Sequence, residues 1–495
     1  MKIKYIWLIL ATMIFVACET DDGGDTMTEP VVELTAGNAD FTNYVALGAS
    51  FTAGFADGAL FIASQENSFP NILSQQFAAT GGGDFTQPLM SDNNGGLLLG
   101  GIPIANPRLF FNGAGPEVLD AVPTTEVTNI LSGPFNNTGV PGAKSFHLVA
   151  PGYGNVGGVA TGQANPYFAR MASSANATML EDAASQNPTF FTLSEVGGND
   201  VLGFATSGGA GVDQTGNFDP TTYGPNDITD PNVFASTFNA IVGTLTGNGA
   251  GGAVTSVPYV TSLPYFTTVP YNAAPLDAAT AGALNAAFAE YNGGLLQAES
   301  FAFITAEERE ARTINFVEGQ NAVTIVDEDL TDLTGLGLPS YRQTTPDDLV
   351  VLTAASFIGT TVDGNPLLVN GLSVPLEDQW VLTANETQSV ITATDAYNVT
   401  IEQVASANGL AFVDLKAILQ QASTTGIQFD DFTMDTSLVF GGLVSLDGIH
   451  LTARGYALMA NKFLEAIDAA YGSNFVAAGQ TASANNYIVS YPPSL

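Results

Sequence analysis

The chain has 495 residues and is strongly acidic, with 48 Asp and Glu against 11 Lys and Arg and a formal net charge of −37. A surface of this charge repels phosphate backbones, so we do not expect nucleic acid as a partner. Wholesale disorder is also excluded, because 45% of the residues are hydrophobic and only 12% are charged. We therefore expect a globular protein with a sizeable core.

The first 17 residues have the pattern of an export signal. Lys2 and Lys4 form a short basic start, and residues 5–17 are almost wholly apolar but too few to span a bilayer. This run ends in the letters FVAC, whose cysteine, Cys18, is the only one in the chain. The ending resembles the lipobox of bacterial lipoproteins of the Bacteroidota type. That resemblance implies export, lipidation of Cys18 and anchoring to the outer membrane through the lipid. The acidic residues 19–22 that follow resemble the signal that carries some lipoproteins to the cell surface, and a solvated linker is the alternative for them. An ordinary signal peptide followed by an unrelated cysteine is the alternative.

Residues 18–40 are polar and acidic, and we expect them to form a flexible linker. Apolar runs predict short buried strands at 43–48, 189–193, 252–263 and 410–413. Apolar residues at helical spacing predict helices at 69–77, 278–301, 385–407 and 453–471. Buried strands that alternate with helices predict a parallel sheet covered on both faces, which is a three-layer α/β/α fold.

The predicted domain covers residues 41–475 and is followed by a C-terminal tail, 476–495. Its third and fourth strands lie roughly 145 residues apart, far more than one crossover needs. We therefore interpret 305–382 as an inserted cap. The stretches 133–162 and 208–226 are rich in Gly, Pro and Asn and predict long surface loops, where substrate walls are usually built.

Three separated segments combine a polar side chain with glycine. The letters GASFTAG place Ser50 just after the first strand, where a tight turn can expose its hydroxyl. The letters NTGVPGA contain Gly142, and a glycine lets a ligand approach the backbone N–H closely. The letters GGND follow the second strand and contain Asn199, whose amide can donate to a developing negative charge. Taken alone, each segment is more often a simple turn.

The fourth segment has the letters DGIH and contains Asp447 and His450 just before the last helix. Residues three apart on such a loop can face each other, so that the carboxylate accepts from one imidazole nitrogen. The other nitrogen is then free to act as a base. The only other histidine is His147, which we interpret as a loop residue. An aspartate at a helix start with a surface histidine nearby is the alternative.

In this order, the four segments resemble those of the SGNH hydrolases, also called GDSL esterases and lipases. Ser50 matches the nucleophile of the family's first block, and Gly142 matches the glycine of its second. Asn199 matches the asparagine of the Gly-x-Asn-Asp block. Asp447 and His450 match the closing Asp-x-x-His. The resemblance covers most of the chain outside the predicted cap.

This resemblance implies a flavodoxin-like α/β/α fold and hydrolysis of carboxylic esters through an acyl-Ser50 intermediate, without a cofactor or a metal. The oxyanion would be held by the N–H groups of Ser50 and Gly142 and by the Asn199 amide. Ala49 and Phe51 stand where the family usually has Asp and Leu. Neither position supplies catalytic atoms in the family, but the narrower subfamily stays open.

The expected partner is an ester of a small molecule, a lipid or an acylated glycan. Loops that set acyl and alcohol specificity are not readable from the residues, so an esterase or lipase and a polysaccharide O-deacetylase both stay open. Two readings without catalysis are also open. In one, the chain is a surface lipoprotein that binds glycans or lipids; in the other, it is a structural lipoprotein of the envelope.

Overall fold

The computed structural model describes residues 32–495. The predicted signal peptide, Cys18 and most of the predicted linker lie outside the described residues. Residues 34–495 form one compact unit. The last part of the predicted linker is held against this unit, since the Asn38 N–H donates to the carbonyl oxygen of Tyr471 at 2.8 Å. No helix within 32–495 combines the length and the apolar character needed to cross a membrane.

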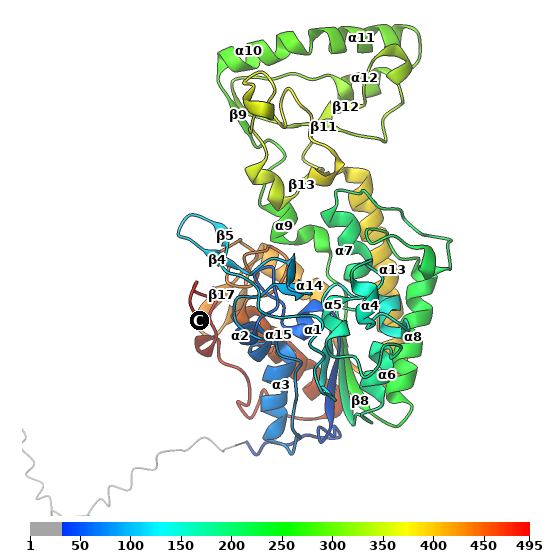
Figure 1. Ribbon diagram of the computed structural model, residues 1–495, viewed down its shortest axis with the longest axis vertical. Coiled ribbons are helices and arrows are strands. Elements are labelled where there is room, and N and C mark those ends of the chain that lie inside the picture. Colours follow the sequence, from blue (N-terminus) through cyan, green and yellow to red (C-terminus); the bar gives the residue numbers. More distant parts are fainter. Residues whose placement is uncertain (1–31) are drawn as a thin grey trace, which may run out of the picture. The chain divides into compact units, whose positions relative to one another are not determined.

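A five-stranded parallel sheet lies at the centre of residues 34–495 (Figure 1). In spatial order its strands are β6 (Asn137–Gly139), β1 (Tyr44–Gly48), β7 (Phe190–Ser194), β8 (Gly251–Thr255) and β15 (Ala411–Val413). Numbered along the chain, this order is 2-1-3-4-5, so the direction of strand addition reverses beside β1. In open α/β sheets, ligands bind at such a reversal, outside the carboxyl ends of the strands. The predicted parallel α/β sheet is confirmed.

Helices pack on both faces of the sheet. One face contacts α6 (Met179–Ala184), α8 (Pro231–Thr246) and α13 (Ala384–Asn408), and the other contacts α3 (Phe69–Ala78) and α15 (Ala453–Tyr471). Val45 and Leu47 of β1 belong to the first core cluster, whereas Tyr44 and Ala46 belong to the second. This alternation explains why every residue of the strand is buried and why its sequence reads as a continuous apolar run.

Several predicted elements need correction. Strand β6 lies inside the stretch predicted as a surface loop, 133–162. The predicted third strand is shorter, because β8 ends at Thr255 and the chain continues into the 3₁₀ helix η3 (Val260–Ser262). The helix predicted at 278–301 is two helices, α10 (Ala278–Ala287) and α11 (Ala289–Ser300), which meet at Phe288. The predicted helices at the positions of α3, α13 and α15 are confirmed within one residue at each end.

The remaining elements before residue 268 and after residue 382 have ten residues or fewer each. They are α1 (Ser50–Ala53), α2 (Ile62–Glu66), β2 (Leu97–Leu99), β3 (Ile102–Ala105), β4 (Leu109–Phe111), β5 (Pro116–Val118), η1 (Ser145–Val149), α4 (Val156–Val159), α5 (Pro166–Ala169), α7 (Asn199–Thr206), η2 (Pro220–Thr222), α9 (Pro264–Thr267), α14 (Leu415–Thr424), β16 (Ile427–Phe429), β17 (Phe432–Met434) and η8 (Ala484–Asn486). Three of the strand pairs are antiparallel hairpins, β2–β3, β4–β5 and β16–β17.

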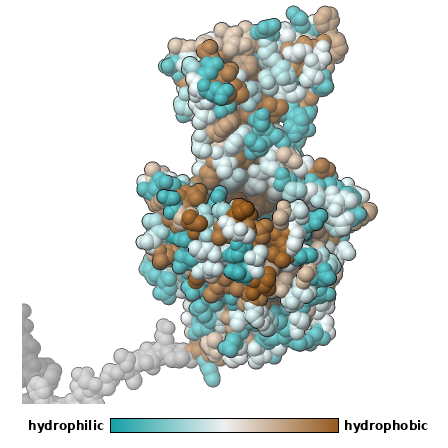
Figure 2. Space-filling model, viewed as in Figure 1, coloured by the Kyte–Doolittle hydropathy of each residue, from teal (hydrophilic) through white to brown (hydrophobic). Residues whose placement is uncertain are grey.

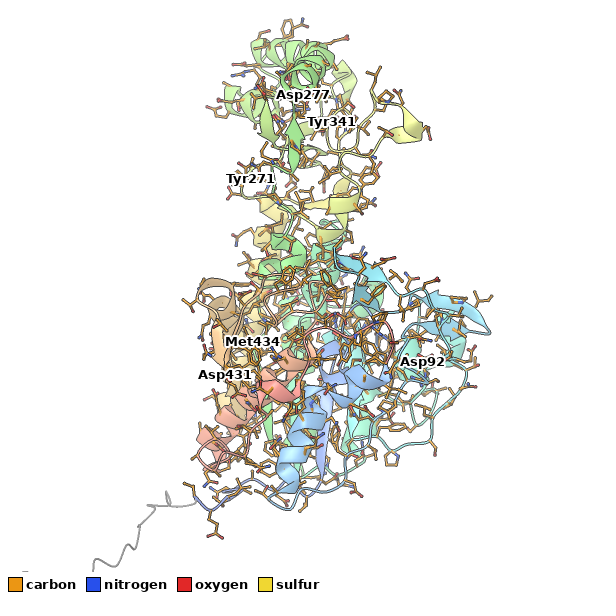
Figure 3. The ribbon with its side chains drawn as sticks, turned by 90° about the vertical axis from the view of Figure 1, so that its left-hand side faces the viewer. Asp92, Tyr271, Asp277, Tyr341, Asp431 and Met434 are labelled. Carbon is orange, nitrogen blue, oxygen red and sulfur yellow. The ribbon has the colours of Figure 1, made fainter. Side chains whose placement is uncertain are left out.

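Residues 268–382 form a region that we call the insert. Its elements are β9 (Ala274–Leu276), α10, α11, α12 (Ala306–Arg312), β10 (Gly319–Asn321), β11 (Thr324–Val326), η4 (Thr334–Leu336), β12 (Tyr341–Gln343), β13 (Leu349–Val350), η5 (Leu352–Ser356), η6 (Val362–Gly364), η7 (Asp378–Trp380) and β14 (Val381–Leu382). The predicted cap, 305–382, lies within it. Because β10 pairs with β9, residues before 305 fold together with the predicted cap. Tyr271, Asp277 and Tyr341 mark the insert in Figure 3.

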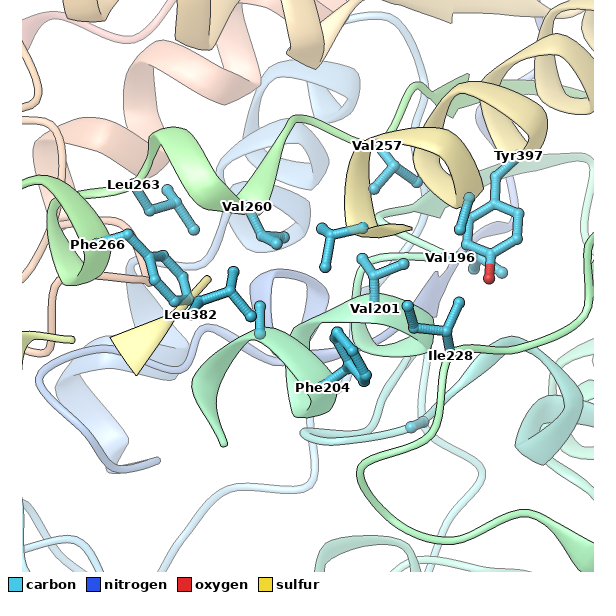
Figure 4. Packing of buried hydrophobic residues seen from close by; sticks show 14 of the residues in the cluster. Val196, Val201, Phe204, Ile228, Val257, Val260, Leu263, Phe266, Leu382 and Tyr397 are labelled. Atoms are coloured by element: carbon cyan, nitrogen blue, oxygen red, sulfur yellow. The ribbon is translucent and has the colours of Figure 1, made fainter. Parts of the chain in front are cut away.

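The insert shares its hydrophobic core with the sheet. Figure 4 shows this core extending from Tyr397 of α13 through Val201 of α7 to Phe266 of α9 and Leu382 of β14. All four side chains are fully buried or nearly so. The base of the insert is therefore packed onto the helices that cover the sheet.

Candidate active site

Asp447 and His450 lie on the loop that leads into α15, and the structure brings their side chains together. Asp447 Oδ2 is 2.8 Å from His450 Nδ1, and each side chain is 12% exposed. An ionised carboxylate only accepts hydrogen bonds, so Nδ1 carries the proton and Nε2 is left with its lone pair. This is the tautomer that a general base requires.

Asp447 is held in its ionised form by the loop around it. Its oxygens accept from the backbone N–H groups of Ile449 and His450 at 2.9 Å, and from the Gly58 N–H at 2.8 Å. Burial alone would raise the pKa of Asp447. Attraction to His450 and the hydrogen bonds from His450 and Ile449 outweigh burial and lower it well below its ordinary value.

A second loop, at residues 55–58, is hydrogen-bonded to the loop of Asp447 and His450 and holds it in place. The Asp57 N–H donates to Ser445 Oγ at 3.0 Å, and the Leu446 N–H donates to Asp57 Oδ1 at 3.0 Å. Burial raises the pKa of Asp57 to about 7, aided by the charge of Asp447. Asp57 was not predicted as part of the site. An isolated Asp-Gly pair is typical of a turn, and the local sequence does not predict a hydrogen bond to Ser445, 388 residues away.

Ser50 is the first residue of α1 and is 7% exposed. The next turn of the chain contacts the imidazole: the ring centroids of Phe51 and Phe55 lie 5.9 and 4.6 Å from that of His450. The structure therefore places the turn of Ser50 beside His450. Within residues 32–495, no hydrogen bond joins the two side chains themselves. In the absence of substrate, such bonds are often long and tighten only in the reacting complex.

The turn of Ser50 depends on the glycine before it. A Cβ on Gly48 would lie 2.6 Å from the carbonyl oxygen of Ser194 on the neighbouring strand β7. A side chain at this position would push β1 and β7 apart. Glycine therefore lets the chain turn from β1 directly into α1, with Ser50 at the carboxyl end of the strand.

The three predicted oxyanion donors follow three adjacent strands, β1, β6 and β7. Among the described residues, the backbone N–H groups of Ser50 and Gly142 make no hydrogen bond. Asn199 donates one amide hydrogen to the Ala143 carbonyl oxygen at 3.0 Å, which fixes the amide beside Gly142. Two unengaged N–H groups and the second amide hydrogen are what an oxyanion site requires.

Glu195 is a further residue that the sequence analysis missed. It follows β7 with a left-handed backbone (φ 52°), and its carboxyl accepts from the Phe51 N–H at 2.6 Å. The nearby N–H groups of Thr52 and Ala49 also favour its ionised form. Glu195 thus holds the N–H of Phe51, next to Ser50, while the Ser50 N–H stays unengaged among the described residues. Burial raises the pKa of Glu195 to about 8 against these donors. The available signal was a glutamate directly after a largely apolar strand.

Two other polar residues near these segments have structural partners. His147 Nδ1 accepts from the Lys144 N–H at 3.0 Å, and its ring stacks on Tyr153 with centroids 4.2 Å apart. Burial lowers the pKa of His147 to about 3. Asp200 is fully buried and accepts from the N–H and the hydroxyl of Ser145 at 2.8 and 2.6 Å. It ties the start of α7 to the segment that follows Gly142.

One group of carboxylates among residues 32–495 has the geometry to hold a metal ion. Oxygens of Glu328, Asp378 and Glu386 lie within 4.8 Å of one another. Burial raises the pKa of Asp378 to about 6 and that of Glu386 to about 7. None of the three is Asp447 or His450, the pair that we call the dyad, or one of the predicted oxyanion donors.

A cavity of about 490 Å³ opens beside the dyad and is bordered by His450, Phe55 and Leu352 among others. Figure 2 shows the molecule hollowed between the insert and the rest of the unit, with hydrophobic residues around the hollow. The arrangement can therefore admit an apolar group to the imidazole.

Comparisons with known proteins add nothing to this geometry. No family model, curated protein or solved structure matches the chain.

Proposed function

We propose that the protein is a serine hydrolase of carboxylic esters, with Ser50 as nucleophile, His450 as base and Asp447 as its orienting carboxylate. The observation that carries this proposal is the Asp447–His450 hydrogen bond of 2.8 Å, with the imidazole packed against the helix that begins at Ser50. These are the roles of the SGNH hydrolases, which the motifs resemble. The strand order 2-1-3-4-5 and helices on both faces agree with their flavodoxin-like, three-layer fold.

The first step is attack by the Ser50 oxygen on the ester carbonyl. His450 Nε2 takes the serine proton while Asp447 stabilises the imidazolium through Nδ1. The low pKa of Asp447 keeps the carboxylate charged when the imidazolium forms. The same proton then passes from His450 to the leaving alcohol, and the acyl group stays on Ser50.

The tetrahedral oxyanion is stabilised by the N–H groups of Ser50 and Gly142 and by the Asn199 amide. Each such donor contributes on the order of 10²–10³ in rate. Glu195 accepts the N–H of Phe51, the residue after Ser50, and so holds the turn that presents the Ser50 N–H. Water, activated by His450, then releases the acid. No step requires a metal or a cofactor.

The setting of this enzyme is also a proposal. The FVAC ending supports lipidation at Cys18 and an outer-membrane lipoprotein, and the acidic residues 19–22 after it support exposure at the cell surface. Its substrate would then be an ester outside the cytoplasm, of a small molecule, a lipid or an acylated glycan. The net charge of −37 disfavours an anionic substrate and nucleic acid.

The test compares the wild-type protein with Ser50→Ala in hydrolysis of p-nitrophenyl esters and in covalent labelling by a fluorophosphonate. We expect hydrolysis and labelling by the wild type and loss of both in Ser50→Ala. Ser300→Ala is the matched control, because Ser300 is exposed on α11 and bonds only within its helix. A wild type that is inert toward both reagents, or labelling that survives Ser50→Ala, would reject the proposal.

A further inference from the structure

The cavity beside the dyad is bordered by segments from three parts of the chain. The β4–β5 hairpin contributes Leu109 and Pro116, and η5 of the insert contributes residues 352, 353, 355 and 356. Tyr265 of α9 also borders the cavity. Apart from the dyad itself, no described residue that borders the cavity is charged. The site therefore suits an uncharged, largely apolar group.

Helix α9, which leads into the insert, and Leu352 of the insert both lie against the loop of Asp447 and His450. The Tyr265 N–H donates to the Gly448 carbonyl oxygen at 3.0 Å. Gly448 has a left-handed backbone (φ 76°), and a Cβ there would lie 2.9 Å from the Tyr265 nitrogen and 3.1 Å from Leu352 Cδ2. Leu352 therefore packs directly against the loop of His450, which fixes this wall of the cavity relative to the imidazole.

The position of the cavity indicates which part of an ester it receives. It borders Asp447 and His450 but, among the described residues, none of the predicted oxyanion donors. In hydrolysis by a serine and a histidine, the carbonyl oxygen faces those donors. The departing alcohol must lie beside the imidazole, which gives it a proton. A cavity on the imidazole side is therefore placed to hold the alcohol and not the acyl chain.

Resting on the proposed function, we infer that the insert and the β4–β5 hairpin together form the binding site for the alcohol part of the substrate. The alcohol would be uncharged and aliphatic. Because the net charge of −37 repels anions, phosphorylated alcohols are excluded from this class. The insert is then the element that selects the substrate.

The test uses two ester series with the full-length protein. In the first, the acid is acetic acid and the alcohol grows from ethanol to octanol. In the second, the alcohol is ethanol and the acid grows from acetic to octanoic. We expect kcat/KM to rise by up to about fourfold per methylene in the alcohol series and to stay flat in the acid series. A rise confined to the acid series would overturn the inference.

Two variants narrow the cavity from its two walls, Leu352→Trp and Leu109→Trp. Each should lower the ratio of kcat/KM for octyl acetate to kcat/KM for ethyl acetate by about tenfold or more. Leu367→Trp is the control, since Leu367 is 76% exposed on the same insert and does not border the cavity. An equal loss on every ester in both variants would overturn the inference.

Binding of 1-octanol, measured by calorimetry on Ser50→Ala, separates this inference from the proposed function. If no ester is hydrolysed but 1-octanol binds Ser50→Ala and not Ser50→Ala with Leu352→Trp, the cavity assignment stands and the enzyme proposal fails. If esters are hydrolysed through Ser50 but the alcohol chain has no effect and 1-octanol does not bind, the enzyme stands and the cavity assignment fails.

Discussion

The carboxyl of Glu195 gives a pH-dependent test of how the turn of Ser50 is held. Glu195 is 7% exposed and accepts the Phe51 N–H at 2.6 Å. Burial raises its pKa from an ordinary value of 4.5 to about 8. We propose the change Glu195→Gln, which keeps an acceptor for Phe51 but removes the titrating group. The quantity to compare is the free energy of unfolding across the pH range.

The direction of the pH effect on stability depends on whether the folded or the unfolded chain holds the Glu195 proton more tightly. The folded chain keeps the Glu195 proton to a higher pH than the unfolded chain does. The stability that it contributes is therefore complete below about pH 4.5 and is lost as the pH rises toward 8. Since one pKa unit corresponds to about 1.36 kcal/mol, the loss is on the order of 5 kcal/mol. The Glu195→Gln variant should not show this loss of stability as the pH rises.

The assay is urea unfolding at intervals from about pH 4.5 to 8.5. Burial also raises the pKa values of Asp57 and Glu386 to about 7. These two groups should likewise lower the stability of the fold as the pH rises. The difference in unfolding free energy between wild type and Glu195→Gln isolates the contribution of Glu195. The control is Glu181→Gln, since Glu181 is an exposed residue in the first turn of α6. Parallel curves for wild type and Glu195→Gln would show that Glu195 does not carry a raised pKa, and the reasoning would be wrong.

Three further outcomes follow from the site and the insert. Asp447→Asn should lower kcat by about 10⁴ without unfolding the loop, because the amide favours the wrong tautomer of the imidazole; a loss under about tenfold would contradict the triad. Arg342→Met should destabilise the fold by about 3–5 kcal/mol in urea unfolding, since Asp327 and Asp348 lose their buried partner; an unchanged midpoint would contradict this. Ester hydrolysis should persist in EDTA, and its loss would implicate a metal.

The fold was predictable where burial leaves a simple pattern. Strands β1 and β7 are buried on both faces, so their apolar runs were found within a residue or two. Strand β6 is at the sheet edge and has the polar letters NTG. Its Asn137 amide donates to the Thr52 carbonyl oxygen, and the Thr138 hydroxyl donates to that of Ala46. In the sequence, such polar residues look like those of a loop. For this reason β6 was predicted as part of a surface loop.

The site was predictable only in part, for a similar reason. Ser50, Gly142, Asn199, Asp447 and His450 were found because they stand in recognisable local patterns. The residues that hold those patterns in place, at positions 57 and 195, are single carboxylates whose partners lie far away in sequence. Their roles depend on contacts that arise only when the sheet is assembled. No local spacing predicts such contacts.

The two halves of the candidate site come from opposite ends of the chain, and this explains why a long insert between them is tolerated. Asp57 and Ser445 are bonded across 388 residues. The entropy of closing a loop grows only logarithmically with its length, by about 0.6 kcal/mol per doubling. The ends of the insert are also pinned together, because Val350 pairs with both Val269 and Val381. The insert can therefore vary in length and still leave the loop of the dyad in place, and it can remodel the cavity wall without disturbing the imidazole.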